Sequence, residues 1–577
     1  MKVPKLFSAV KYENLKDMME QVTANHANHR AFVIKHKEGK KISYENITYE
    51  QLGKQINYLG TAFLQRGFAG KRVAIISKNR YEWILSYLAV MNGVGITVPL
   101  DKDLPAQEIL SLLQRSKANA IVFETKYIED VYSFYQEKST GLQLLICMDV
   151  LTAEQKEKYP GMVSLQELLD EGAEKWEQGE HGYANLTIDA EAMATIIFTS
   201  GTTSLSKAVM LSHKNLVSNL YDLGRTEKIY DTDMNMAFLP YHHTFGSTGQ
   251  LFFLYNGACS CYCDGLRYIQ ENLKEYQVSV FVCVPLLLEA MYKKIMLQVE
   301  KQGKTKLIQH MTKLCNGLLR IGIDIRRVVF KQILSQLGGK IRFVISGASA
   351  IDGEVVKGFR NFGILCVQGY GLTETAPVLS AERKGLVRYG SIGFPMPSVE
   401  IKIEEPDENG VGEIVAKGPN VMLGYYENEE STNEVLQNGW FHTGDLGYFD
   451  KDGFLFVTGR KKNVIVLKNG KKVFPEEMEL LINNLPYVAE SMVFGWPVED
   501  DVEVSAKIVY NKEYTDKIFS DCNEEQLKEI IWKDIKEINR SLAKYKYMKN
   551  LIITDQPMIK TSTAKIKRHE ELKTISA

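Results

Sequence analysis

Several features that mark other classes of protein are missing or scarce in this chain of 577 residues. Cysteine occurs only eight times, spread along the chain, which argues against a disulfide framework and suits a reducing compartment. Neither sign of charge dominates, because 70 Lys and Arg residues face 71 Asp and Glu residues. The composition therefore gives no reason to expect a nucleic acid as partner, and the length predicts more than one domain.

Long uncharged apolar runs are scarce as well. The first residues, MKVPKLFSAVKYENLKDMMEQ, carry scattered charges and no apolar core of signal-peptide length, so we expect no secretion. One uncharged window, 83–100, has the length of a membrane span, but its Asn, Gly and Pro residues favour a buried helix, a Gly turn and a strand. We expect a cytoplasmic protein whose membrane contact, if any, is peripheral, at the inner face.

A Walker A motif is also missing, which argues against an ordinary P-loop kinase or ATPase. The chain has instead TIIFTSGTTSLSKAVML at 195–211, where an apolar strand runs into small hydroxyl-bearing residues and then a lysine. Glycine lets backbone N–H groups approach an anion closely, and hydroxyl groups add donors. A simple Ser/Thr turn has a similar composition. We interpret the segment as a polyphosphate-binding loop formed by Thr199, Ser200, Gly201, Thr202, Thr203 and Lys207.

Strand-like runs alternate with helical patterns along the chain, as in VSVFVCV at 278–284 and in a helix expected to begin after Ser212. This alternation predicts an α/β fold with parallel sheets, flanking helices and ligands at the carboxyl ends of the strands. From Ser398 short alternating strands predict a small β-rich subdomain. We expect a large N-terminal domain, 1–460, and a small mobile α+β C-terminal domain, 461–577.

Four segments, in order, resemble the motifs of the AMP-forming, or adenylating, acyl-CoA synthetases. They are the loop above, YGLTETAP at 370–377, WFHTGDLGYFDKDGFLFVTGR at 440–460 and KTSTAKIKR at 560–568. Two more segments are most similar to the long-chain fatty acyl-CoA synthetases, namely IRFVISGASA at 341–350 and GKKVFPEEME at 470–479. The resemblance covers nearly the whole chain. It implies an enzyme that activates a carboxylic acid as an acyl-adenylate and transfers it to coenzyme A, releasing pyrophosphate and AMP.

The resemblance also implies roles for single residues. Glu374 and Thr199 would bind Mg²⁺ through an anionic and a neutral oxygen. Lys565 would bridge the acyl carboxylate and the α-phosphate of ATP, where two anions must meet. His243 would lie near the carboxylate and the incoming thiol, although the adjacent His242 leaves the register open and a structural histidine is the alternative.

Further residues would bind the nucleotide and coenzyme A. Tyr370 would stack on adenine, Asp445 would accept from both ribose hydroxyls, and Arg460 would hold the ribose or a phosphate. Lys462 matches the family's hinge position, from which the C-terminal domain would pivot between the two half-reactions. The implied nucleotide and coenzyme A contacts are Gly347, Ala348, Tyr370, Gly371, Thr373, Asp445, Arg460, Lys462 and Gly470.

Some positions depart from the family pattern. Ser204, Ser206 and Ala208 stand where the family has Gly, Pro and Gly, and Ile559 and Ala564 replace Pro and Gly near the lysine tail. Alanine costs about 1 kcal/mol where a positive φ is required, so these changes put the turnover rate in doubt. They leave the reaction class unchanged.

Residues 293–340 hold eleven Lys or Arg residues and two acidic ones, interleaved with Leu, Ile and Met. This pattern predicts basic amphipathic helices, which would border an acyl tunnel or rest on anionic lipid; core-packing helices with a solvated face are the alternative. We interpret the protein as an ATP- and Mg²⁺-dependent ligase of medium- to long-chain fatty acids and coenzyme A. Two alternatives remain: an acyl-AMP or acyl-carrier-protein ligase, and a non-catalytic nucleotide-binding regulator, against which the intact Lys565 and Glu374 count.

Overall fold

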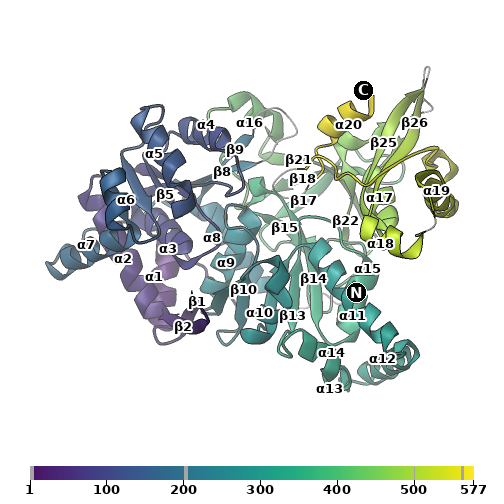
Figure 1. The fold of residues 1–577 in the computed structure, drawn as a ribbon, viewed down its shortest axis with the longest axis horizontal. Coiled ribbons are helices and arrows are strands. Elements are labelled where there is room, and N and C mark those ends of the chain that lie inside the picture. Colours follow the sequence, from purple (N-terminus) through teal and green to yellow (C-terminus); the bar gives the residue numbers. More distant parts are fainter. Residues whose placement is uncertain are drawn as a thin grey trace. The chain divides into compact units, whose positions relative to one another are not determined.

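The computed structural model describes residues 5–199, 206–468, 470–498, 501–520, 522–560 and 565–576. These residues form two compact units (Figure 1). The first comprises the described residues up to 400 together with 416–441, and the second comprises 401–415 and the described residues from 442 on. The β-rich segment is thus grouped with the C-terminal residues. The domain boundary after Arg460 stays a prediction.

The first unit contains a sheet of eight strands in the order β19-β9-β8-β4-β3-β5-β6-β7. Strands β8, β4, β3, β5, β6 and β7 run parallel, and β9 and β19 add an antiparallel edge. The parallel strands are almost completely buried and rich in Val, Ile and Ala, as expected for strands covered on both faces. The strands are β3 (Lys71–Ile76), β4 (Gly95–Pro99), β5 (Ala120–Phe123), β6 (Leu144–Cys147), β7 (Met162–Ser164), β8 (Met193–Thr199), β9 (Lys207–Ser212) and β19 (Gly424–Tyr425).

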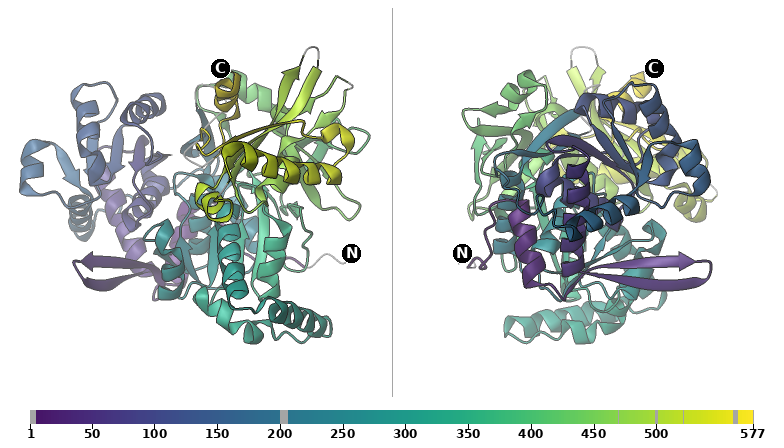
Figure 2. Two further views of the ribbon diagram at one scale, coloured as in Figure 1. Left: turned by 45° about the vertical axis from the view of Figure 1, so that its right-hand side comes forward. Right: turned by 90° about the vertical axis from the view of Figure 1, so that its left-hand side faces the viewer.

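A second sheet of the same unit has nine strands in the order β16-β15-β14-β13-β12-β10-β11-β1-β2. Its centre is parallel, and both edges are antiparallel. At one edge the β1–β2 hairpin projects away from the neighbouring helices (Figure 2). The strands are β1 (Arg30–Glu38), β2 (Lys41–Thr48), β10 (Met234–Ala237), β11 (Cys259–Tyr262), β12 (Val280–Cys283), β13 (Phe343–Ser346), β14 (Leu365–Gly371), β15 (Val378–Ala381) and β16 (Phe394–Pro395).

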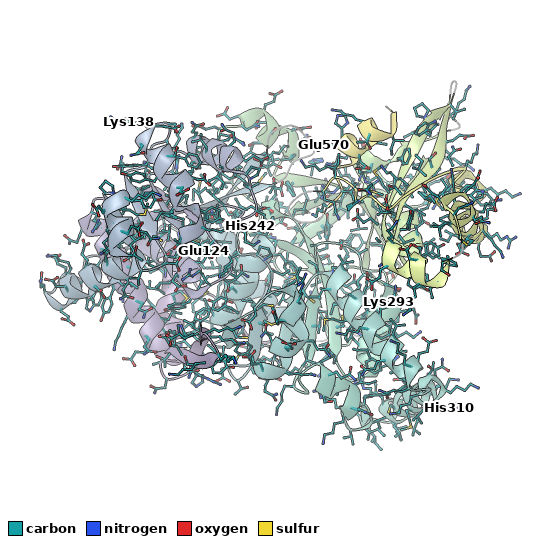
Figure 3. All side chains as sticks on the ribbon, in the orientation of Figure 1. Glu124, Lys138, His242, Lys293, His310 and Glu570 are labelled. Carbon is teal, nitrogen blue, oxygen red and sulfur yellow. The ribbon has the colours of Figure 1, made fainter. Side chains whose placement is uncertain are left out.

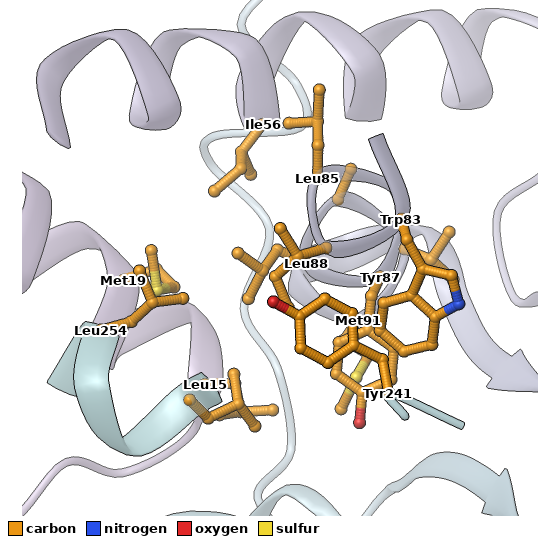
Figure 4. Packing of buried hydrophobic residues seen from close by; sticks show 14 of the residues in the cluster. Leu15, Met19, Ile56, Trp83, Leu85, Tyr87, Leu88, Met91, Tyr241 and Leu254 are labelled. Atoms are coloured by element: carbon orange, nitrogen blue, oxygen red, sulfur yellow. The ribbon is translucent and has the colours of Figure 1, made fainter. Parts of the chain in front are cut away.

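Several helices of the first unit pack their apolar sides into a large core that includes residues of both sheets. Within it, Trp83 of α3 (Tyr81–Ala89) stacks on Tyr87, with ring centroids 4.9 Å apart, and lies 5.1 Å from the ring of Tyr241 (Figure 4). Other helices that contribute are α1 (Leu15–Asn25), α2 (Tyr49–Gln65), α8 (His213–Thr226) and α9 (Thr244–Tyr255).

Two local predictions are confirmed. Residues 83–100 form the rest of α3, a short π-helical turn at Val90–Val94 and strand β4. Ser212 caps α8, because its hydroxyl accepts from the Asn215 N–H while the Asn215 side chain accepts from the Ser212 N–H. Among the described residues, no helix has the length and apolar character to cross a membrane.

The described residues of the second unit contribute to three small sheets, one of them the pair β23 (Ile465–Val466) and β24 (Lys472–Val473). The predicted β-rich segment forms β17 (Glu400–Glu404), β18 (Gly412–Lys417), β21 (Trp440–Phe449) and β22 (Leu455–Arg460), with β21 paired to β22. The C-terminal residues form a three-stranded sheet, on which α17 (Pro475–Asn483) and α19 (Glu524–Ser541) pack around a separate core. Its strands are β25 (Val488–Val498), β26 (Asp501–Tyr510) and β27 (Asn550–Thr554). The combination of helices with parallel and mixed sheets in the two units agrees with the predicted α/β fold class.

Candidate active site

Strands β8 and β9, which flank the predicted phosphate loop in the sequence, pair antiparallel. Thr199 ends β8 and pairs with Lys207, the first residue of β9, whose carbonyl accepts from the Thr199 hydroxyl at 3.3 Å. The sequence had indicated the strand before the loop but not the strand after it. Ser200, Gly201, Thr202 and Thr203 lie outside the described residues, as does Ser204.

Lys207 is linked to Glu374 through the side chain of Tyr425. The Lys207 ammonium lies 4.6 Å from the centre of the Tyr425 ring, on the neighbouring strand β19. The Tyr425 hydroxyl in turn donates to Glu374 Oε1 at 2.8 Å. Burial, reinforced by the Glu374 charge, raises the pKa of Tyr425, so its hydroxyl stays protonated and remains a donor. These contacts bring Thr199, Lys207 and Glu374 into one cluster.

Glu374 itself is held by its backbone. It lies in a short 3₁₀ turn, Thr373–Thr375, directly after β14, and its carbonyl accepts from the Met422 N–H at 2.8 Å. Thr373 accepts a hydrogen bond from the Thr244 hydroxyl at 3.2 Å. A carboxylate and a hydroxyl are hard oxygen donors that suit Mg²⁺, so Glu374 and Thr199 fit the ligand type predicted for them.

The predicted adenine contacts lie at the carboxyl ends of two adjacent parallel strands. Gly347 and Ala348 follow β13, and Tyr370 and Gly371 end β14. Ala348 has a φ of 76°, a backbone conformation that L-residues rarely adopt. A side chain at Gly371 would lie 1.8 Å from the Pro377 carbonyl oxygen, so only glycine fits there.

His243 is the residue that precedes α9, and its carbonyl accepts from the Ser247 N–H at 3.0 Å. The adjacent His242 is buried (Figure 3), with its Nε2 3.4 Å from an oxygen of Asp101 and its ring centroid 4.3 Å from that of His243. The two histidines thus have different environments. His242 pairs with a carboxylate, whereas His243 is the N-cap residue of α9. The catalytic role of His243 stays a prediction.

In the second unit, Asp445 and Arg460 lie opposite each other on β21 and β22. Asp445 is buried, and the Arg460 Nε lies 3.1 Å from its Oδ1. Arg460 therefore contacts the carboxylate to which the resemblance assigns ribose binding. This contact is what we expect of two residues that belong to one site.

Sequence reasoning missed Glu413, which supports the turn before Asp445. Glu413 accepts from the Gly444 N–H at 3.1 Å and from the Lys461 ammonium at 2.8 Å. Burial acts to raise the pKa of Glu413, but these two hydrogen bonds outweigh burial and hold the pKa below its usual value. Glu413 therefore stays ionised and keeps the turn in place until the pH falls through that lowered pKa.

The remaining predicted residues lie elsewhere in the second unit. Lys462 is the middle residue of a 3₁₀ turn, Lys461–Asn463, directly after β22. Gly470 has a φ of 77°, in a turn where an added Cβ would meet nothing within 4 Å. Lys565 is exposed, and Ala564 before it lies outside the described residues. The roles of these residues stay predictions.

Comparison with known proteins places the chain in a family. Residues 19–426 match the family model described as AMP-binding enzyme, and residues 462–576 match that described as AMP-binding enzyme C-terminal domain. Long-chain-fatty-acid–CoA ligase 5 of Rattus norvegicus is 28% identical over 577 residues, covering 91% of this chain and 82% of the relative. A long-chain-fatty-acid–[acyl-carrier-protein] ligase of Arabidopsis thaliana is 26% identical, covering 90% of this chain and 80% of the relative.

A solved structure has the same fold. It is an anthranilate CoA ligase in complex with anthranoyl-AMP, with a TM-score of 0.74 and 19% identity, covering 100% of this chain and 99% of that one. The order of the family motifs and the two matching family models agree with one another. This chain belongs to the AMP-binding enzyme family and is an adenylate-forming acyl-CoA synthetase.

Proposed function

We propose that this synthetase activates medium- to long-chain fatty acids with ATP and Mg²⁺ and transfers the acyl group to coenzyme A. The observation that carries this proposal is the cluster of Lys207, Tyr425 and Glu374 beside strands β8 and β9, which offers a cation to a polyphosphate and a carboxylate to the Mg²⁺ that accompanies it. Relatives named as long-chain-fatty-acid–CoA ligases support the acyl class.

In the first half-reaction the acyl carboxylate attacks the α-phosphorus of ATP, and pyrophosphate leaves. Both reactants are anions, so the side chains must offset charge that gathers on the α-phosphate oxygens. Lys207 and Lys565 supply positive charge, and Tyr425 fixes one oxygen of Glu374. Mg²⁺, held by Glu374 and Thr199, would neutralise phosphate charge.

In the second half-reaction the thiol of coenzyme A attacks the acyl carbonyl of the adenylate, and AMP leaves. Lys565 has no part in this step, so the C-terminal residues pivot at Lys462 and bring the Gly470 turn beside the pantetheine arm. His243 lies near the carboxylate and the thiol. Asp445 and Arg460 hold the ribose throughout.

One assay tests this function. Pyrophosphate release is measured with ATP, Mg²⁺ and a panel of carboxylic acids, first without and then with coenzyme A. We expect release with fatty acids of medium to long chain and a thioester product when coenzyme A is present. Release with none of the acids would favour the non-catalytic regulator.

A carrier protein is the alternative acceptor, because one relative is named as an acyl-carrier-protein ligase. Incubating the enzyme with a fatty acid, ATP and either coenzyme A or a holo-carrier protein separates the two. Thioester on coenzyme A supports our proposal, and thioester on the carrier alone contradicts it.

Replacing Glu374 with Gln tests the metal site. Glutamine keeps an oxygen that accepts from Tyr425, so the substitution removes charge and little else. We expect the Mg²⁺ concentration for half-maximal pyrophosphate release to rise roughly tenfold and the rate to fall with it. Asp445→Ala serves as control, because it should act through ATP affinity. An unchanged Mg²⁺ titration of Glu374→Gln would reject the assignment.

We also propose peripheral contact with an anionic membrane surface at the cytoplasmic side. Helices α11 (Pro285–Lys301) and α12 (Thr305–Arg320) are adjacent (Figure 1). They expose apolar side chains among their lysines. The exposed apolar residues from this segment are Leu286, Leu297, Leu307, Leu314, Leu319, Ile321, Ile323 and Val328. Basic and apolar side chains together suit anionic lipid.

Cosedimentation with vesicles checks this contact. We expect binding to phosphatidylserine-containing vesicles that weakens several-fold in 0.5 M salt and in a Leu307→Asp, Leu314→Asp variant. Ile518→Asp, at another exposed apolar position, is the control. Binding that is equal for charged and neutral vesicles would contradict the proposal.

A further inference from the structure

Three metal-ligating side chains meet at the amino ends of strands in the nine-stranded sheet. They are His26, His29 and Asp231, and one ligand atom of each lies within 4.8 Å of the other two. His26 follows α1, His29 directly precedes β1, and Asp231 lies three residues before β10. Strands β1 and β10 both pair in parallel with β11, one on either side, so the loops before them lie at the same end of the sheet.

The two histidines are brought together by a tight turn. The His29 N–H donates to the His26 carbonyl at 2.7 Å, and the ring centroids are 5.2 Å apart. Two further hydrogen bonds fix this turn to the start of α2. The Tyr49 N–H donates to the His29 carbonyl and the Glu50 N–H to the Ala27 carbonyl, both at 3.0 Å. The backbone that carries the two rings is therefore preorganised.

His26 is the most buried of the three residues. Its ring lies against Gly257, two residues before β11, where an added Cβ would meet ring atoms at 2.6 Å, so glycine makes room for the ring. Partial burial, together with His29, lowers the pKa of His26 against the opposite effect of Asp231. The ring is thus neutral at pH 7, and the neutral imidazole is the form that binds a metal.

His29 and Asp231 approach each other at a distance longer than a hydrogen bond. His29 Nδ1 lies 3.8 Å from Asp231 Oδ2, and the two side chains are 45% and 43% exposed. Two ligand atoms of a tetrahedral zinc ion, with bonds of about 2.0–2.2 Å, are roughly 3.4 Å apart. Exposed side chains rotate readily, so movements of about 1 Å bring the ligand atoms to this spacing.

We propose that His26, His29 and Asp231 bind a zinc ion, which links the loop after α1 to the loop before β10. Two imidazoles and a carboxylate are ligands that suit Zn²⁺, whereas Mg²⁺ prefers a set of oxygen ligands. Water completes the fourth position at this exposed site. The ion then holds together the ends of two strands that are separated by β11.

This zinc site is distinct from the candidate active site. The predicted adenine contacts follow the carboxyl ends of β13 and β14, which belong to the same parallel centre of the sheet as β10. The three ligands lie at the amino ends, so we expect the ion to stabilise the fold and to take no part in adenylation. The inference is therefore independent of the proposed function.

Zinc binding to the full-length enzyme tests the inference. Metal-free wild type, His29→Gln and Asp231→Asn are dialysed to equilibrium against Zn²⁺, and the bound ion is counted. We expect wild type to bind one more equivalent per chain than either variant, with a dissociation constant at least about tenfold lower. A hundredfold excess of Mg²⁺ should leave this ion bound. Both substituted side chains are exposed, so the variants should fold.

His36→Gln is the matched control. His36 pairs with Glu45 at 2.9 Å, and both side chains are about as exposed as those of His29 and Asp231, but among the described residues this pair belongs to no group of three ligands. We expect His36→Gln to bind zinc as wild type does. Zn²⁺ should raise the melting temperature of wild type and of His36→Gln by about 2 °C or more, and should leave that of His29→Gln unchanged.

Several results would overturn the inference. Equal binding by wild type, His29→Gln and Asp231→Asn would place the ion elsewhere, for example at Asp101, His242 and His243 beside the candidate active site. An equal loss in His36→Gln would indicate non-specific surface binding, and displacement by Mg²⁺ would contradict a site with two imidazoles. No bound zinc would show that His29 and Asp231 form only an ion pair.

Discussion

Replacing Lys565 with Ala is expected to slow adenylate formation by about two to three orders of magnitude, the loss that follows removal of one transition-state charge donor. In the proposed mechanism, Lys565 bridges the acyl carboxylate and the α-phosphate only while these two anions react. Thioester formation from supplied acyl-adenylate should survive, because the carboxylate and the α-phosphate no longer need to be held against their repulsion. Pyrophosphate exchange and thioester formation, measured separately, check both expectations.

A nearby lysine provides the control for this substitution. Lys567 is exposed and pairs with Glu570 at 3.1 Å, so Lys567→Ala removes the same charge two residues away. Pairs this exposed contribute little to stability. We expect Lys567→Ala to keep both half-reactions. An equal loss of both half-reactions in Lys565→Ala would show that the assigned role is wrong.

Replacing Lys462 with Pro is expected to separate the two half-reactions. Lys462 lies in a 3₁₀ turn directly after β22, and we propose that its backbone dihedrals change between the adenylating and thioester-forming conformations. Proline fixes φ near −65° and removes an N–H, so one conformation should be retained and the other lost. Retention of the adenylating form would preserve pyrophosphate exchange and abolish thioester release, and retention of the other would do the reverse.

The control for this prediction leaves the backbone dihedrals of residue 462 unrestricted. Lys462→Ala removes the side chain without restricting φ, so its two activities should remain in the wild-type proportion. The melting temperature of each variant monitors folding, because local strain would lower stability and both activities in parallel. A proportionate loss of the two half-reactions in folded Lys462→Pro would contradict alternation of the C-terminal residues.

One residue that departs from the family pattern, Ser206, is held in place by hydrogen bonds from another side chain. Ser206, which stands where the family has proline, is bound by Arg115: one guanidinium nitrogen donates to the Ser206 hydroxyl at 3.0 Å and another to its carbonyl at 2.6 Å. Proline could offer only the carbonyl. The arginine thus anchors the first described residue after the loop, just before Lys207.

Local patterns predicted much of the fold, because they depend on neighbours in the sequence. Period and capping residues placed α8 after Ser212, and glycine and proline identified 83–100 as a buried helix and a strand. Strand β9, which follows the loop, was not predicted, because its pairing with β8 and with the distant β19 cannot be read from its own short sequence.

The sequence by itself determined the family, the reaction class and the residues of the motifs, because the types and order of those residues carry the chemistry. Only the tertiary structure decided which other side chains act on them. Tyr425 binds Glu374 across 51 residues, and Glu413 supports the turn before Asp445 from 31 residues away. Periodicity predicts which face of an element is buried but not what that face contacts.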